Sequence, residues 1–120
     1  MEEYKLGQME TKFAEMIWKL EPVASGELVK QCADAFGWKK STTYTMLKRL
    51  CQRGLFQNSG GQVRALISQT DFTALQSEQF VEDTFDGSLP RFLAAFARRK
   101  KLSAEEIDEL QKLIDDYQEE

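Results

Sequence analysis

Histidine is absent from the 120 residues of the chain. Histidine is the most frequent general base of enzymes and a preferred ligand of zinc, so its absence argues against acid–base catalysis and against a zinc site. The sequence also has no glycine-rich phosphate loop ending in Lys-Ser or Lys-Thr, and no nucleophile elbow. We therefore expect a protein that is not an enzyme and that requires no metal or other cofactor.

Cysteine is scarce, and long apolar runs are missing. The two cysteines, Cys32 and Cys51, occur in segments with helical, core-facing patterns. No apolar run is long enough to cross a membrane, and no signal-peptide pattern is visible at the N-terminus. These absences predict a cytoplasmic protein with two reduced, buried thiols and no membrane partner.

Carboxylates are missing from the middle of the chain. The net charge of −4 by itself disfavours nucleic acid as a partner, but no Asp or Glu occurs between residues 35 and 70. That stretch carries six cations, whereas residues 71–120 carry six cations and thirteen carboxylates. The distribution predicts a basic binding surface in the middle of the chain and a separate task for the acidic C-terminal half.

The basic stretch contains one strongly patterned segment, Lys39 to Arg53. It predicts an amphipathic helix with Ser41 as its N-cap, Leu47 at the centre of its apolar face and Gly54 as its stop. The opposite face carries hydroxyl, amide and guanidinium groups, which hydrogen-bond phosphates and base edges. We assign DNA binding to this segment through Lys39, Lys40, Ser41, Thr42, Thr45, Lys48, Arg49 and Arg53.

Two helices are predicted before this segment. Apolar residues at helical spacing indicate a first helix over residues 8–20 and a second over residues 26–36. Ser25 is the expected N-cap of the second helix, and Gly37 is the expected left-handed residue that ends it.

A hairpin is predicted after the segment. Two β-prone runs, residues 55–58 and 62–68, flank a turn containing Gly60-Gly61. Three helices followed by a hairpin are the order of a winged helix-turn-helix domain, in which the third helix enters the major groove of DNA. We assign this domain to residues 1–70, with Arg64 as a DNA contact of the wing; the alternative is that the hairpin only closes the core.

Residues 71–120 predict three more helices. Ser88 and Ser103 are expected N-caps of the last two, and the basic run 98–101 suits a helix C-terminus. These helices carry more apolar residues than a small DNA-binding domain can cover, which predicts a helical dimerisation domain and a homodimer. The alternative is that the helices fold back on their own chain. The apolar stripes consist of Leu89, Phe92, Leu93, Phe96, Ile107, Leu110, Leu113, Ile114 and Tyr117.

A winged helix can also serve as a protein-interaction module without a specific DNA target. The residues on the outer face of the third helix discriminate between the two functions. A protein-docking face is typically apolar or acidic, whereas this face carries Thr42, Thr45, Lys48, Arg49 and Arg53. The composition of the face therefore favours double-stranded DNA as the partner.

With this order of elements, the chain resembles the penicillinase and methicillin-resistance repressors over residues 6–117. No single motif is specific to this family, but the ordered set of motifs, at spacings that match the family, is specific to it. The motifs are FAEMIW at residues 13–18, Gly37-Trp38, TTYT at 42–45, LKRL at 47–50, Arg53-Gly54, Gly87-Ser88-Leu89 and LSAEEIDEL at 102–110.

The resemblance implies a mostly α, dimeric winged-helix repressor that binds palindromic operators and dimerises through its C-terminal helices. By position, Thr42, Thr45 and Arg49 match the recognition-helix residues of the family, and Arg64 matches a common wing cation. We therefore expect a transcriptional repressor, with an antibiotic-resistance operon among its candidate targets.

The sequence departs from the family pattern at three points. Ser41 stands where the family often has lysine, so a DNA contact is lost or moved to Lys39 or Lys40. Ala95-Phe96 stands where the β-lactam-responsive repressors are cut at an Asn-Phe pair, so that route of inactivation is in doubt. No cysteine follows Cys51, so the cysteine cluster of the copper-responsive branch is absent.

Overall fold

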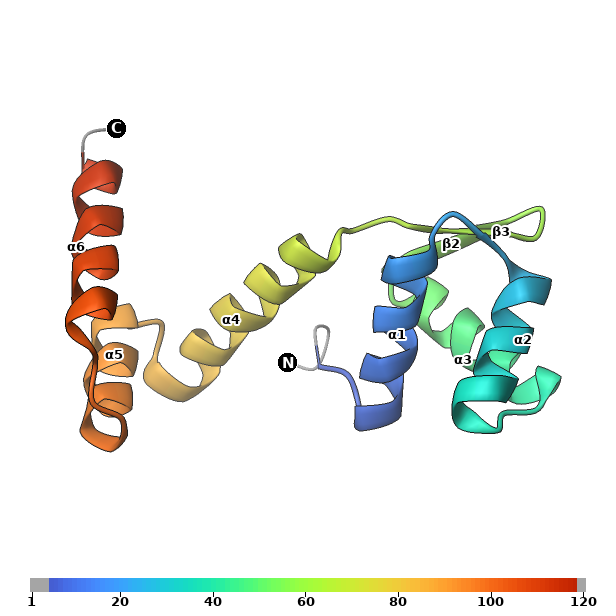
Figure 1. Cartoon of the computed structure of the whole chain (residues 1–120), viewed down its shortest axis with the longest axis horizontal. Helices are drawn as coiled ribbons and strands as arrows, with labels where there is room; N and C mark the ends of the chain where they lie inside the picture. Colours follow the sequence, from blue (N-terminus) through green and yellow to red (C-terminus); the bar gives the residue numbers. More distant parts are fainter. Residues whose placement is uncertain (1–4, 119–120) are drawn as a thin grey trace. The chain divides into compact units, whose positions relative to one another are not determined.

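The computed structural model describes residues 5–118, and the mostly α winged helix-turn-helix fold predicted from the sequence is confirmed (Figure 1). The chain forms two compact units, one that runs to Gln79 and one that starts at Phe80. The elements are α1 (Gln8–Leu20), β1 (Val23–Ala24), α2 (Ser25–Phe36), α3 (Lys40–Gln52), β2 (Phe56–Ser59), β3 (Gln62–Ala65), α4 (Gln69–Phe85), α5 (Leu89–Arg99) and α6 (Ala104–Gln118).

The first unit contains a small antiparallel sheet with strand order β1-β3-β2. Val23 pairs with Val63, and Phe56 pairs with Ala65. The hairpin turn is Gly60-Gly61, with φ of +59° and +84°. Positive φ at both central residues matches the right-handed twist of the strands, and glycine adopts it without steric cost, which confirms the predicted turn.

The core of the first unit lies between the three helices and this sheet. Trp18 packs against Phe56 and Phe72 with ring centroids 5.2 and 5.5 Å away, and its indole nitrogen donates to the Ile67 carbonyl at 2.9 Å. Phe72 belongs to α4, so the start of α4 is part of the first unit. The side chains that are fully or almost fully buried include Phe13, Ile17, Leu28, Cys32, Leu47, Leu50, Leu55, Phe56 and Val63.

Two predicted N-caps are wrong. Ala24 occupies the N-cap position of α2, and Ser25 is its first residue and is buried. Helix α3 begins at Lys40, because the amide of Thr43 already donates to the carbonyl of Lys39, and Ser41 therefore lies inside the first turn. Neither α2 nor α3 has a side-chain hydrogen bond at its N-cap.

The predicted glycine stops are correct. Gly37 has φ of +68° after α2, and Gly54 has φ of +84° after α3. The amide of Gly37 donates to the Ala33 carbonyl at 3.0 Å, and that of Gly54 to the Cys51 carbonyl at 3.0 Å. These bonds satisfy carbonyls that a helix end otherwise leaves unpaired.

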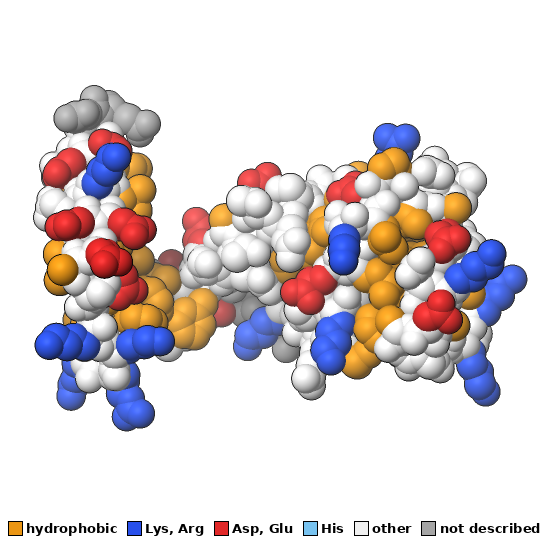
Figure 2. All heavy atoms as spheres, viewed as in Figure 1, with side chains coloured by type: hydrophobic (Ala, Val, Ile, Leu, Met, Phe, Trp, Pro, Cys, Tyr) orange, Lys and Arg blue, Asp and Glu red, His pale blue; other side chains and the backbone are white. Residues whose placement is uncertain are grey.

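The second unit consists of the end of α4, α5 and α6. The Ser88 hydroxyl accepts from the Arg91 amide at 3.2 Å. Ser103 and Glu106 form a reciprocal capping box, so both predicted caps are confirmed. No described residue of α5 or α6 is buried, and Figure 2 shows hydrophobic side chains on the surface of this unit beside acidic ones. None of the described helices is long and apolar enough to cross a membrane.

Candidate nucleic-acid interface

Helix α3 divides into a buried and an exposed face as its sequence predicts. Thr43, Leu47 and Leu50 are buried, with exposures of 2% or less, and they hold the helix against the core. The exposed face contains no carboxylate, so it offers only neutral polar groups and cations to a ligand. Its exposed residues are Ser41, Thr42, Thr45, Lys48, Arg49 and Gln52.

Three lysines border this face. Lys39 precedes the first turn of α3, Lys40 begins it, and Lys48 lies two turns further along; all three are exposed. Among residues 5–118 none of the three takes part in an ion pair of 4.0 Å or less. Their ammonium groups are therefore available to an anion such as a DNA phosphate.

The wing carries one further cation. In β3 the side chain of Val63 is buried, and Arg64 is exposed because successive residues of a strand point to opposite faces. Arg64 pairs with Gln57 across the hairpin, close to the exposed Gly60-Gly61 turn. The hairpin thus packs Val63 into the core on one face and exposes the guanidinium of Arg64 on the other, and the DNA contact of Arg64 stays a prediction.

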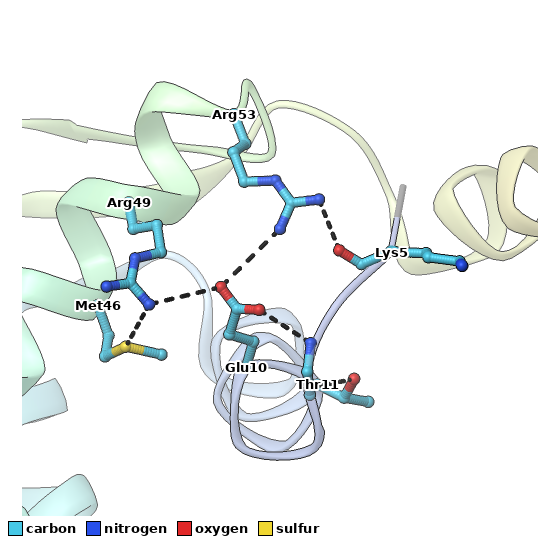
Figure 3. A network of polar contacts seen from close by, with 7 residues as sticks. Lys5, Glu10, Thr11, Met46, Arg49 and Arg53 are labelled. Atoms are coloured by element: carbon cyan, nitrogen blue, oxygen red, sulfur yellow. Dashed lines mark hydrogen bonds and ion pairs between the residues drawn. The ribbon is translucent and has the colours of Figure 1, made fainter. Parts of the chain in front are cut away.

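Arg49 and Arg53 converge on one carboxylate of α1 (Figure 3). An Nη atom of Arg53 lies 3.8 Å from Glu10 Oε2, and an Nη atom of Arg49 lies 4.0 Å from the same oxygen. Arg53 also donates to the Lys5 carbonyl at 2.6 Å. Arg49 remains accessible, with 55% of its side chain exposed, whereas Arg53 retains 24%. Arg53 is thus engaged within the chain, a role that sequence reasoning missed.

A second contact that sequence reasoning missed joins α2 to α3. The hydroxyls of Ser25 and Tyr44 lie 3.0 Å apart, and the amide of Ser25 donates to the Gly61 carbonyl at 2.8 Å. These bonds connect the start of α2, the recognition helix and the turn of the wing. No local pattern in the sequence relates Tyr44 to Ser25, which lies 19 residues earlier in the chain.

The two thiols are free, as the sequence predicts, but only Cys32 is buried; Cys51, near the end of α3, is partly exposed, so the prediction of two buried thiols is wrong for Cys51. Burial raises the pKa of Cys32 and of Cys51 above the ordinary thiol value, and hydrogen bonds with Thr43 and Asn58 respectively only partly oppose this effect. Both thiols are therefore protonated and weakly nucleophilic at neutral pH. Within the described part of the chain no three His, Cys, Asp or Glu side chains are grouped as metal ligands.

The fold and this surface define a winged helix-turn-helix protein with a basic recognition helix. The profile of the penicillinase repressor family matches residues 6–116. The chain therefore belongs to the penicillinase repressor family and is a DNA-binding transcriptional repressor. This assignment favours the DNA-binding interpretation over a protein-interaction module, and the family is one of transcriptional repressors rather than enzymes.

Two relatives illustrate how far the similarity extends. The penicillinase repressor of Bacillus licheniformis is 26% identical over 117 residues, which cover 94% of this chain and 91% of the relative. The methicillin resistance regulatory protein MecI of Mammaliicoccus sciuri is 21% identical over 115 residues, covering 92% and 94% respectively. The match includes both compact units in each case.

Proposed function

We propose that this repressor acts as a homodimer that reads a palindromic operator with two copies of α3. The observation that carries the proposal is the exposed face of α3, which has hydroxyls, an amide and cations but no carboxylate. A helix of this kind fits the major groove, where base edges and phosphates are both within reach.

Most of the exposed side chains of this surface have a proposed role. Thr42, Thr45 and Arg49 contact base edges, because they lie on the outward side of α3. Lys39, Lys40 and Lys48 contact phosphates, together with the hydroxyl of Ser41. Arg64 contacts the backbone beside the wing. Arg53 supports this surface through its bonds to Glu10 and Lys5, and we do not count it among the phosphate contacts.

The proposed dimer forms through the second unit. None of the described residues of α5 and α6 is buried, and even the large apolar side chains of Leu113 and Tyr117 are 66% and 77% exposed. Short helices are stabilised mainly by burying an apolar face, so these helices need a further surface. A second copy of the same unit can supply that surface, because a two-fold dimer brings the same apolar patch of both chains together. A mainly apolar groove between α5 and α6 is lined by Phe92, Leu93, Phe96, Leu102, Leu110 and Leu113, together with Glu106 and Glu109.

In this arrangement the first unit binds DNA and the second unit dimerises, with α4 as the connection. Repression then follows from occupation of a promoter by the dimer. The names of the two relatives link them to penicillinase and to methicillin resistance. We therefore propose an antibiotic-resistance operon as the first target to test.

Selection from a random duplex library tests this function directly. We expect the purified full-length chain to enrich an inverted repeat whose half-sites are separated by one helical turn of DNA or a multiple of it. The bound pool is sequenced after several rounds at moderate salt. A pool without a repeated motif, bound weakly and in a salt-sensitive manner, would contradict the proposal and favour a protein partner for the same face.

Arg49→Ala tests the assignment of a base contact. We expect it to weaken binding to the selected operator by about 1–3 kcal/mol per half-site and to remove the preference at one base pair, because a bidentate arginine–guanine pair is lost. Binding to every single-base variant of the operator is compared with that of Lys48→Ala, which should weaken all sequences alike. A uniform loss for Arg49→Ala would make Arg49 a phosphate contact.

A further inference from the structure

Glu10 connects the start of α1 to the recognition helix. It is the third residue of α1, and its Oε1 accepts the amide of Gly7 at 2.8 Å, as a capping glutamate does. Its Oε2 instead faces Arg49 of α3 and Arg53, the residue that directly follows α3 (Figure 3). The side chain is only 17% exposed, so its carboxylate is partly shielded from solvent. Shielding strengthens an ion pair relative to one at the open surface.

The contact with Arg49 uses only one nitrogen of its guanidinium. The same Nη1 atom lies 4.0 Å from Glu10 Oε2 and 3.6 Å from the sulfur of Met46. Within residues 5–118, Nε and Nη2 make no hydrogen bond or ion pair. A guanidinium offers two donors along each edge, so the Nε–Nη2 edge remains available. Such an edge can donate to the two major-groove acceptors of a guanine, O6 and N7.

We propose that Glu10 is a positioning residue that sets the sequence specificity of Arg49. It holds Nη1 of Arg49 against α1 and leaves the Nε–Nη2 edge directed at the base. This inference rests on the proposed function, because it takes Arg49 as a base contact. Pre-ordering the side chain reduces the conformational entropy lost on binding and favours one pairing geometry over others.

Arg53 fixes the carboxylate in this arrangement. Its guanidinium is bound on one side by the Lys5 carbonyl at 2.6 Å and on the other by Glu10 at 3.8 Å. Arg53 therefore holds Glu10 from the end of α3, while Gly7 holds it from the start of α1. Because the Glu10 carboxylate is held by both contacts, it offers Arg49 an acceptor at a fixed position.

The opposite role, in which Glu10 competes with DNA for Arg49, predicts a different result. Competition requires the ion pair to break before Arg49 reaches a base, so removing the charge would tighten operator binding. Positioning leaves the pair intact in the complex, so removing the charge would instead reduce discrimination between bases. The two roles are therefore separated by one substitution.

Glu10→Gln in the full-length chain is that substitution, because glutamine still accepts the Gly7 amide but carries no charge. Glu15→Gln is the matched control: Glu15 lies on α1, is exposed, forms no ion pair with the described residues, and changes the net charge equally. Affinity is measured for the selected operator and for a second operator that is changed at one base pair. This is the base pair at which the Arg49→Ala variant no longer distinguishes between bases. Thermal unfolding of each variant verifies the fold.

We expect Glu10→Gln to reduce the ratio of the affinity for the selected operator to the affinity for the changed operator about tenfold. This reduction lies within the discrimination that one bidentate arginine–guanine pair provides. Glu15→Gln should leave the ratio unchanged. In an Arg49→Ala background Glu10→Gln should have no further effect on the ratio, because the two residues act through one contact. A merely structural Glu10 would lower stability or overall affinity without this dependence on Arg49.

Three results would overturn the inference: an unchanged ratio in Glu10→Gln, a loss that persists in the Arg49→Ala background, or tighter binding with the ratio retained. In each case the wild-type chain still selects its operator, so the proposed function stands. A wild-type chain that selects no sequence would instead overturn the proposed function, and the inference with it.

Discussion

Replacing both Leu110 and Ile114 with aspartate is expected to convert the proposed dimer into a monomer and to weaken operator binding by a factor on the order of 10² to 10⁴. Both side chains lie on the apolar stripe of α6, and Ile114 is 48% exposed in the single chain. A buried carboxylate without a partner costs far more than the apolar contact it replaces contributes. Loss of the dimer also turns one bivalent binding event into two independent ones.

Lys112→Asp is the control for this experiment. It changes the net charge by the same amount as the double substitution, and it lies roughly 200° around the helix from Leu110, away from the apolar stripe. Light scattering gives the mass in solution, and titration of the operator gives the affinity. A double variant that keeps the mass of the parent protein would show that α6 does not form the dimer contact.

The second large effect is a steep dependence of operator affinity on salt. If Lys39, Lys40, Lys48 and Arg64 contact phosphates in both protomers of the proposed dimer, the complex has eight cationic phosphate contacts, which predicts a slope of roughly −7 in a plot of log K against log salt. Between 50 and 200 mM salt the affinity should then fall about 10⁴-fold, through the release of counterions from DNA. A slope near −2 would contradict the assignment of these residues.

Lys39→Ala combined with Lys40→Ala provides the internal check on this slope. Four contacts are removed from the dimer, so the slope should become shallower by roughly 3.6. The preference among operator sequences should be unchanged, because phosphate contacts position the protein without reading bases. A change in sequence preference would indicate that one of these lysines reaches a base instead, as the departure at Ser41 allows.

Local patterns were sufficient to predict most of the first unit. Leu47 and its helical neighbours defined the buried face of α3, because burial of an amphipathic helix follows a period that is visible in the sequence. Gly37, Gly54 and Gly60-Gly61 marked the ends of helices and the turn of the wing, because few other residues adopt positive φ. The run without carboxylates between residues 35 and 70 located the candidate DNA surface.

The amino-acid sequence by itself thus determined the order of the elements, the outward face of α3 and the apolar stripes of α5 and α6. Only the tertiary structure decided what Arg53 and Tyr44 do, and that Glu10 reaches Arg49. The physical reason is range: periodicity and turn chemistry act over a few residues. An ion pair between α1 and α3, or a hydroxyl pair between α2 and α3, depends on packing that brings distant segments together.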